Sequence, residues 1–250
     1  RETTLYLKYI ILFFLGSVLM RSAGCIFNDI VDKDFDTKVL RTKERPIASG
    51  KISVVGSLIY IILLCSIALL ILLQFNFLTI TLGMSSIILA LAYPFMKRIT
   101  YWPQLFLGLT FNWGIIVGWA SISNSVSIEP IILYLAAIFW TLGYDTIYGL
   151  QDMRDDEIIG IKSTSIKFKN NIKVFVGTCY TLCVLFVLIL CLMMEIDKYL
   201  LALSAFFIST LIYQIKFFKI DNPKSCLVAF KINNLTGIFI FLFIFSLTIS

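Results

Sequence analysis

Two acidic motifs in the sequence combine residue types and spacings that suit the binding of a divalent cation. Asn28, Asp32 and Asp36 are spaced four residues apart in NDIVDKDFD, and Asp152 and Asp156 are four residues apart in QDMRDDE. Four residues make slightly more than one helical turn, so each set is predicted to form one face of a helix. Carboxylates held this closely repel one another unless a cation lies between them. Each motif therefore predicts a cation site.

Magnesium is the cation that this chemistry favours. Hard divalent cations take oxygen ligands, and magnesium is usually held by one or two carboxylates together with substrate phosphates. The two motifs predict two magnesium positions that flank a phosphorylated substrate. The alternative is an acid-rich, solvated loop that pairs with its own lysines. Because the chain contains no histidine, catalysis would rely on carboxylates, cations and metal ions.

Cationic residues follow both acidic motifs and occur in one further segment. Arg41 follows the first motif and Lys162 follows the second, while the segment AYPFMKRITYWPQ contains Lys97 and Arg98. Cations at these positions suit an anionic leaving group or a substrate carboxylate. The alternative for Lys97 and Arg98 is that they anchor a loop at the lipid headgroups.

Three further charges lie inside apolar segments. Arg21 precedes Asn28 by seven residues and Asp145 precedes Asp152 by seven, which would place each on the same helix face as its motif. Ionisable groups within a membrane segment are costly, so they are functional candidates by default. Arg21 and Asp145 are therefore predicted to be site residues. Lys231 has no such alignment, and the sequence assigns it no role because its side chain could reach the headgroups.

The segments that position these motifs have the composition of a membrane protein. Apolar residues make up 59% of the 250 residues and charged residues 14%, with a mean hydropathy of +0.93. Ordinary soluble domains have about 45–50% apolar and about 25% charged residues. This composition excludes a disordered, fibrous or cytosolic protein. The net charge of +6 does not call for a nucleic-acid partner, because the cations lie among carboxylates and beside apolar segments.

Charge-free runs predict an all-α, polytopic bundle of transmembrane helices. No Asp, Glu, Lys or Arg occurs from Ile52 to Met96, which is room for two crossings of roughly 20 residues each. The absence of a period of two excludes a barrel. Most Lys and Arg residues fall in alternate loops, and the positive-inside rule places these loops, with both acidic motifs, on the cytoplasmic or matrix side. Eight spans are predicted in one domain (1–250), at about 5–27, 53–73, 77–95, 104–122, 130–150, 173–194, 199–217 and 227–248.

The motif segments resemble those of the UbiA-type intramembrane prenyltransferases. The resemblance rests on RSAGCIFNDIVDKDFDTKVLRTKERPIASG, YPFMKRITYWPQ and GYDTIYGLQDMRDDEIIGIKSTSIKF, in the order and spacing of the family. The contexts YPFMKR and GYDTIY…IGIKST favour the hydroxybenzoate branch. The resemblance implies nine transmembrane helices around a central cavity. Because the sequence begins with Arg1 and not Met, the eight spans are expected to match helices two to nine of a chain lacking an upstream helix.

The resemblance also implies an activity and its reactants. A magnesium-dependent enzyme would transfer a polyprenyl group from polyprenyl diphosphate to the ring of 4-hydroxybenzoate, ortho to the phenol and meta to the carboxylate. Diphosphate would be released, and the reaction would belong to ubiquinone biosynthesis. The expected surroundings are the lipid bilayer of a bacterial or mitochondrial inner membrane. The sequence names no protein partner and no polyprenyl chain length.

Residue roles follow from the residues and the resemblance together. The metal set comprises Asn28, Asp32, Asp36, Asp152 and Asp156. The diphosphate set comprises Arg21, Lys33, Arg41, Lys97 and Lys162. The aromatic-substrate set comprises Arg98, which would hold the benzoate carboxylate, with Asp152, Tyr93 and Asp145. The catalytic set comprises Asp32, Asp36, Asp152, Asp156 and Arg98. One departure is Lys33, since the bacterial pattern often has Arg there and an ammonium lacks bidentate geometry.

Other functions remain open from the sequence. Within the family, the alternatives are menaquinone, homogentisate and haem-type prenyltransferases. From a different class, a cation-coupled transporter would also place acids in a helical bundle. Such transporters favour sites near the bilayer midplane, whereas the acids here lie mostly in loops or at span ends. A purely structural protein would have no reason to assemble two matched carboxylate faces.

Overall fold

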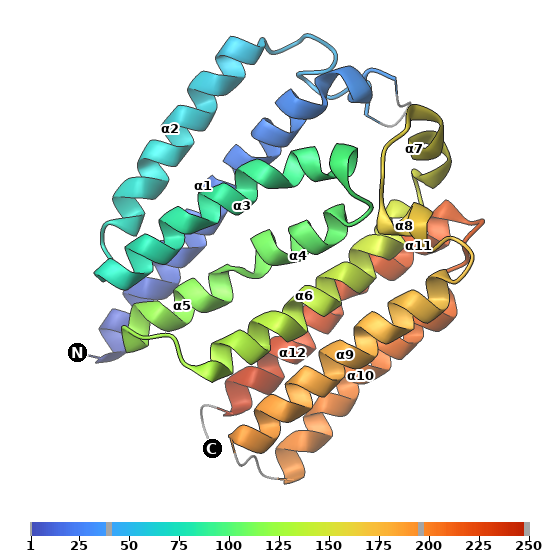
Figure 1. Cartoon of the computed structure of the whole chain (residues 1–250). Helices are drawn as coiled ribbons and strands as arrows, with labels where there is room; N and C mark the ends of the chain where they lie inside the picture. The colour runs from blue at the N-terminus through green and yellow to red at the C-terminus, as the bar shows by residue number, and fades with distance from the viewer. Residues whose placement is uncertain (1, 39–41, 195–197, 248–250) are drawn as a thin grey trace. The chain divides into compact units, whose positions relative to one another are not determined.

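Helices make up the regular secondary structure of the residues that the computed structural model describes, which are 2–38, 42–194 and 198–247 (Figure 1). The bounds of these helices are α1 (Glu2–Asp36), α2 (Val54–Leu72), α3 (Phe77–Ile99), α4 (Pro103–Asn112), α5 (Gly114–Ser123), α6 (Ile128–Gly149), α7 (Met153–Ile159), α8 (Thr164–Lys167), α9 (Ile172–Met193), α10 (Lys198–Phe217), α11 (Pro223–Lys231) and α12 (Asn233–Leu247). The all-α class predicted from the sequence is confirmed.

Among the described residues, seven helical segments are long and apolar enough to cross a membrane. They are Thr4–Asp36, Val54–Leu72, Phe77–Ile99, Pro103–Ser123, Ile128–Gly149, Ile172–Met193 and Pro223–Phe245. Each coincides with one of the predicted spans, and the fourth and seventh join α4 to α5 and α11 to α12. The remaining predicted span, 199–217, coincides with α10, which is not among the seven. The polytopic membrane fold is therefore supported, and the count of eight spans stays a prediction.

The helices group into two compact units. Unit 1 comprises Arg1–Phe95 and Ile116–Val126, and unit 2 comprises Met96–Ile115 and Ser127–Ser250. Helices α3 and α5 each contribute residues to both units. The expectation of a single domain stays a prediction.

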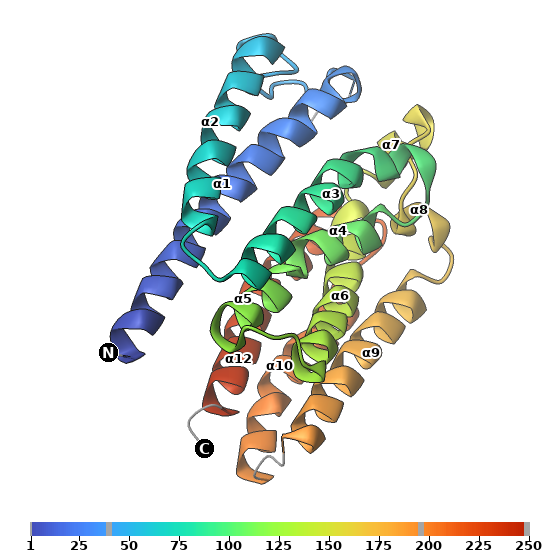
Figure 2. The same ribbon diagram turned by 60° about the vertical axis from the view of Figure 1, so that its left-hand side comes forward.

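In unit 1, α1 and α2 pack side by side and run in opposite directions (Figure 2). Phe75, just beyond the end of α2, packs against α1, with ring centroids 4.9 Å from Tyr9 and 4.7 Å from Phe13. Asn76 then begins α3: its side-chain oxygen accepts from the backbone N–H of Thr79 at 2.9 Å, and its amide donates to the Ala120 carbonyl at 2.8 Å. One amide side chain thus begins α3 and ties it to α5.

The outer surface of α2 is apolar. Val55, Ile62 and Leu70 are 65–68% exposed, and Ser57 and Ala68 are the buried residues of this helix. Side chains of this kind are stable on the outside of a helix where lipid replaces water as the solvent. The exposure pattern is therefore that of a lipid-facing helix.

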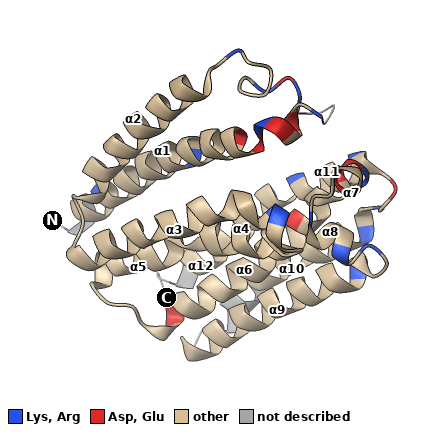
Figure 3. Ribbon diagram, turned by 45° about the horizontal axis from the view of Figure 1, so that its top comes forward, with Lys and Arg blue, Asp and Glu red and all other residues tan. Residues whose placement is uncertain are grey.

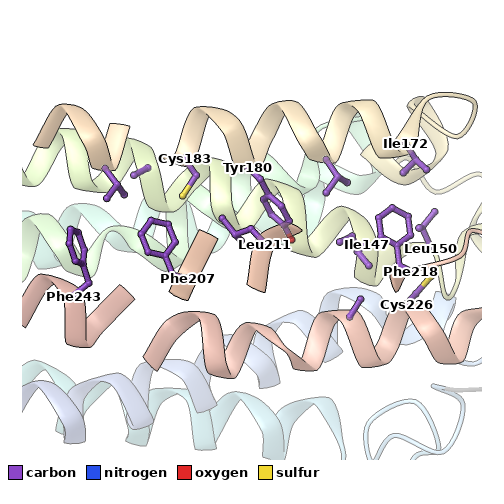
Figure 4. Packing of buried hydrophobic residues seen from close by; sticks show 14 of the residues in the cluster. Ile147, Leu150, Ile172, Tyr180, Cys183, Phe207, Leu211, Phe218, Cys226 and Phe243 are labelled. Atoms are coloured by element: carbon purple, nitrogen blue, oxygen red, sulfur yellow. The ribbon is translucent and has the colours of Figure 1, made fainter. Parts of the chain in front are cut away.

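Unit 2 contains the extended hydrophobic core (Figure 4). Helix α6 packs against both α4 and α9, and α10 packs against α12. Ile147, Tyr180, Phe207 and Phe218 are buried in this core, and Figure 4 shows them directed into the space between the helices. This packing holds in place the end of α6 that leads into the second acidic motif.

A hydrogen-bonded polar network crosses the same core. The hydroxyl of Tyr180 donates to Gln214 Oε1 at 2.6 Å, and Gln214 Nε2 donates to Thr236 Oγ1 at 3.1 Å and to Asn233 Oδ1 at 3.2 Å. Asn233 Oδ1 also accepts from the indole N–H of Trp140 at 2.9 Å. These bonds join helices α6, α9, α10 and α12. Because buried polar groups are costly unless they are paired, the network favours this one helix arrangement.

Candidate functional site

The first acidic motif lies on the last turns of α1. This helix continues without interruption from Glu2 to Asp36, so Asn28, Asp32 and Asp36 stack along one helical face. Asp32 and Asp36 are only 2% and 7% exposed, and Asn28 Nδ2 donates to Asp32 Oδ2 at 3.0 Å. The helical face predicted from the spacing is confirmed. Charged residues gather at this end of α1 and are sparse along the rest of the helix (Figure 3).

A guanidinium group already neutralises part of this face. Arg45 Nη1 donates to Asp29 Oδ1 at 2.9 Å and to Asp36 Oδ2 at 3.0 Å. The turn that follows α1 brings Arg45 back to the helix: the Thr42 hydroxyl donates to the Asp36 carbonyl at 3.1 Å, and the Arg45 N–H donates to the Thr42 carbonyl at 2.9 Å. The contact shows that these carboxylates bind a cation. The sequence does not predict this pairing, because Arg45 is one of several cations between the first two predicted spans.

The other cations predicted near this motif are placed differently. Lys33 is half-buried in the last turn of α1, where a positive charge is favoured by the helix dipole. Arg21 lies on the same helix, seven residues before Asn28, and is exposed. Arg41 lies outside the described residues. The roles of all three stay predictions.

The second acidic motif does not continue the preceding membrane helix, which corrects the prediction of one helical face extending from that span. Helix α6 ends at Gly149, and Asp152 is the N-cap of the separate helix α7, with φ −107° and ψ 2°. Carboxylates are favoured at a helix N-terminus, and Asp155 and Asp156 lie in the first turn of α7. Asp145, on α6, therefore does not share a helix face with Asp152. Within the motif, the Asp156 N–H donates to the Asp152 carbonyl at 2.9 Å, so the two residues remain one turn apart.

Helix α7 is short, and two of its residues form ion pairs with neighbouring segments. Its C-cap is Gly160, whose φ of +82° lies in the left-handed region that favours glycine. Lys169 pairs with Glu157 at 2.7 Å, and Arg154 lies 3.9 Å from Asp221. Both pairs are solvent-exposed, so they contribute little to stability. The second motif therefore depends mainly on α6 and on the segment after Gly160 for its position.

The segment AYPFMKRITYWPQ is helical as far as Ile99, whereas the sequence predicted Lys97 and Arg98 in a loop. Helix α3 extends to Ile99 with Pro94 inside it, so Lys97 and Arg98 lie in its last turn. Cations are favoured at a helix C-terminus. The helix ends before Trp102, which precedes Pro103, the first residue of α4, because a residue before proline is disfavoured in the α conformation. Tyr93, one turn earlier, is half-buried and Arg98 is exposed.

Two of the predicted diphosphate-binding residues, Lys97 and Lys162, are joined through their backbones in unit 2. The Lys162 N–H donates to the Lys97 carbonyl at 2.8 Å, and Lys162 Nζ donates to the Ile99 carbonyl at 3.2 Å. The same ammonium lies 5.7 Å from the centroid of the Tyr101 ring. The segment after α7 is thus paired with the end of α3. Charged residues gather near α7 and α8 (Figure 3).

Each motif offers oxygen donors, which are the type of ligand that magnesium prefers. Among the described residues, no three His, Cys, Asp or Glu side chains converge closely enough to form a metal cage. Magnesium does not need one, because it is commonly held by one or two carboxylates with water and phosphate oxygens completing the shell. The buried carboxylates of Asp32 and Asp36 and the amide of Asn28 are ligands of this type. The Arg45 contact shows that one of these carboxylates, Asp36, already attracts positive charge.

Comparison with known proteins identifies the family. The model of the UbiA prenyltransferase family matches residues 2–244. The chain belongs to the UbiA prenyltransferase family.

UbiA relatives from several organisms carry one name. Proteins called mitochondrial 4-hydroxybenzoate polyprenyltransferase are 43% identical over 234 residues in Drosophila pseudoobscura pseudoobscura and in Bos taurus, each alignment covering 92% of this chain. The relative from Dictyostelium discoideum is 42% identical over 243 residues and 95% of this chain. The chain spans 58%, 62% and 52% of the lengths of these three relatives.

Solved structures of UbiA homologues have the same fold. The apo structure from Aeropyrum pernix K1 has a TM-score of 0.79 at 21% identity, covering 93% of this chain and 88% of that one. A homologue from Archaeoglobus fulgidus bound to DMAPP and Mg²⁺ has a TM-score of 0.71 at 18% identity, covering 96% and 88%. At these identities the likeness establishes the UbiA fold.

Proposed function

We propose that this UbiA-family chain transfers a polyprenyl group from polyprenyl diphosphate to 4-hydroxybenzoate in ubiquinone biosynthesis. The observation that carries the proposal is the buried acidic face of α1, formed by Asp32 and Asp36 with Asn28, in a chain whose relatives bear the name of this enzyme. A buried, paired set of oxygen ligands at the end of an apolar helix suits a diphosphate whose hydrocarbon tail remains in lipid.

The acidic motifs bind the leaving group in this proposal. Asn28, Asp32 and Asp36 would hold one magnesium ion, and Asp152 and Asp156 would hold the other. When bound, magnesium would supply the positive charge that neutralises the departing diphosphate. Support for this assignment comes from the Mg²⁺-bound Archaeoglobus homologue and from the donor types of the two motifs.

Cationic side chains add positive charge around the same diphosphate. The proposed set is Arg21, Lys33, Arg41, Lys97 and Lys162. Preorganised charges of this kind stabilise the negative charge that develops on a leaving group, and they act most strongly where water is excluded. The pairing of Lys162 with the end of α3 supports the inclusion of Lys97 and Lys162 in one group.

The acceptor is bound by the remaining site residues. Arg98 holds the benzoate carboxylate, and Asp152, Tyr93 and Asp145 lie near the phenol. The allylic C–O bond breaks with its electron pair leaving on diphosphate, and the ring carbon ortho to the phenol forms the new C–C bond. That carbon then loses its proton, which restores the aromatic ring. An apolar cavity protects the allylic cation from water during this sequence.

The membrane has a direct role in this proposal. The polyprenyl chain is apolar, and the helices of this protein present apolar side chains to their surroundings. We propose an inner-membrane location, mitochondrial or bacterial, with the motif-bearing ends on the matrix or cytoplasmic side. Relatives named as mitochondrial support the first of these.

The proposal is tested by product formation with the purified chain in detergent or liposomes. The protein is incubated with magnesium, labelled 4-hydroxybenzoate and a series of polyprenyl diphosphates of increasing length, and the lipid extract is analysed for a prenylated ring. The expected result is label in the lipid extract that requires magnesium. Homogentisate and the naphthoate precursor of menaquinone serve as competing acceptors. Preferred use of either would move the chain to another branch of the family, and cation flux without product would support a transporter.

A further inference from the structure

Four buried polar residues join the segment after α7 to helices α4 and α6. The Thr164 N–H donates to Gln104 Oε1 at 3.0 Å, the hydroxyl oxygens of Thr146 and Thr164 are 2.6 Å apart, and Ser165 Oγ donates to the Thr146 carbonyl at 2.8 Å. Gln104 is 6% exposed and the other three are fully buried. We call Gln104, Thr146, Thr164 and Ser165 the polar latch.

The direction of the hydroxyl bond in the latch follows from proton counting. A threonine hydroxyl carries one proton, and Thr146 Oγ1 donates its proton to the Leu142 carbonyl at 2.6 Å. The bond between the two threonines must therefore use the Thr164 proton, with Thr146 as the acceptor. Thr164 is thus bound twice, through its backbone N–H to α4 and through its hydroxyl to α6. Removing its hydroxyl takes away one of the two side-chain bonds from this segment to α6, and it leaves the Ser165–Thr146 and Thr146–Leu142 bonds in place.

The latch lies next to a group of cations. Two residues before Thr164, Lys162 is bound through its backbone N–H to the Lys97 carbonyl and through its ammonium to the Ile99 carbonyl. Lys97 and Arg98 lie in the same last turn of α3. The latch residues themselves carry no charge, so their contribution to an anion site is to hold the cations in place.

We propose that the polar latch is a positioning device that holds Lys162 against the end of α3, so that Lys97 and Lys162 bind one diphosphate group together. The inference rests on the proposed function, because it takes diphosphate as the ligand of these cations. A fully satisfied buried network fixes one arrangement of the segments that it joins. Charges held in place before binding lose less conformational freedom when the anion binds, which strengthens the affinity.

The test measures binding of inorganic pyrophosphate in the presence of magnesium, together with prenyl transfer. Thr164→Val removes the hydroxyl at nearly constant volume, and Thr164→Ser retains it. The loss of one buried hydrogen bond is expected to weaken pyrophosphate binding roughly three- to tenfold. The KM for polyprenyl diphosphate should rise by a similar factor, while the KM for 4-hydroxybenzoate stays unchanged. Thr164→Ser should restore both values.

Thr236→Val is the matched control. Thr210 and Thr236 form a second pair of threonine hydroxyls in unit 2, 2.7 Å apart, on α10 and α12. Thr236→Val removes this bond and also the hydroxyl that accepts from Gln214 Nε2, both away from the cations, so it should lower stability at least as much as Thr164→Val without changing pyrophosphate affinity. An equal loss of affinity in Thr236→Val and Thr164→Val would show that the latch has only a structural role and would overturn the proposal.

A second variant perturbs the latch from the helix side. A Cβ atom at Gly149 would lie 2.6 Å from Ser165 Oγ, which is closer than real contacts allow. Gly149→Ala should therefore displace Ser165 and weaken pyrophosphate binding. Adding Ser165→Ala removes the clashing oxygen and should not restore affinity fully, because the bond to the Thr146 carbonyl is also lost. Gly177→Ala on α9, where no atom lies within 4 Å of the added Cβ, controls for the change of residue type.

The outcomes separate the latch from the proposed function. If wild-type protein binds pyrophosphate and Thr164→Val binds it less tightly, the latch is supported even when no prenylated product forms. If wild-type protein forms product and Thr164→Val binds pyrophosphate as tightly as wild type, the latch is refuted and the proposed function stands. Absence of pyrophosphate binding to wild-type protein would overturn the latch proposal, because its cations would then not bind this anion. Hydrogen exchange of residues 160–166 must also be faster in Thr164→Val than in Thr236→Val, and equal rates would contradict the proposal.

Discussion

Replacing Arg45 by glutamine should destabilise the protein mainly when magnesium is absent. One guanidinium nitrogen donates to carboxylates of both Asp29 and Asp36, at 2.9 and 3.0 Å. Hydrogen bonds to charged groups contribute about 1.5–3 kcal/mol when they are well shielded. Here the Arg45 side chain is 34% exposed and the Asp36 side chain 10% exposed, and solvent screening reduces the contribution of such pairs. We therefore expect Arg45→Gln to lower the free energy of unfolding by about 1–2 kcal/mol, roughly a tenfold change in the equilibrium constant.

Magnesium should compensate for the missing guanidinium. The assay is thermal or denaturant unfolding of detergent-solubilised protein, with EDTA and with magnesium, for wild type and Arg45→Gln. Added magnesium should stabilise the variant more than wild type, because a divalent cation replaces the lost positive charge between the carboxylates. Lys43→Gln, an exposed change in the same turn, should behave as wild type. Equal stability of wild type and Arg45→Gln in EDTA, or the same gain from magnesium in both, would refute the reasoning.

Two further predictions concern the acceptor and the core. Arg98→Ala should raise the KM for 4-hydroxybenzoate about tenfold or more and change the KM for polyprenyl diphosphate little. Arg98→Lys should recover only part of the affinity for 4-hydroxybenzoate, because an ammonium cannot bind both carboxylate oxygens in one plane. The check is steady-state kinetics with each substrate varied, and two unchanged KM values would show that Arg98 only anchors the chain at the headgroups. Gln214→Leu should lower the free energy of unfolding by roughly 1–2 kcal/mol, because it leaves the buried Tyr180 hydroxyl without its acceptor. The double variant Gln214→Leu/Tyr180→Phe should then lose less free energy of unfolding than the two single variants lose in total. Additive losses would contradict the coupling between the two residues.

Local spacing predicted the first motif well because it is a property of one continuous helix. The interval between Asn28, Asp32 and Asp36 determines their common face once α1 continues to Asp36. Apolar run lengths likewise placed the seven candidate spans. These predictions needed only helix geometry and the thickness of a bilayer, which are independent of tertiary contacts.

The second acidic motif and the segment AYPFMKRITYWPQ show where local reasoning was insufficient. Spacing alone extended the face of α6 through Asp152, although α6 ends at Gly149, and it placed Lys97 and Arg98 in a loop, although α3 continues to Ile99. The preference of cations for helix C-termini agrees with the position of Lys97 and Arg98 in the last turn of α3. Acidic residues end α1 and also begin α7, so charge alone does not place these helix boundaries.

Contacts between distant segments could not be inferred from one sequence. Arg45 contacts Asp29 across sixteen positions, and Gln104 contacts Thr164 across sixty. Neither residue stands out by type or spacing, since Arg45 is one of several loop cations and Gln104 is a single amide after a proline. Their roles depend on how the chain folds back on itself, which is decided by packing of whole helices.

The most direct test of the account is a comparison of prenyl transfer by Asp32→Asn and Asp34→Asn. Both variants neutralise a carboxylate on the last turns of α1, but Asp32 is 2% exposed on the motif face and Asp34 is exposed. With magnesium, labelled 4-hydroxybenzoate and polyprenyl diphosphate, Asp32→Asn should transfer the prenyl group about 10²–10³-fold more slowly than wild type while remaining folded. Asp34→Asn should keep near-normal activity. Near-normal turnover by folded Asp32→Asn protein at low magnesium would contradict the assignment of the acidic face of α1 to catalysis.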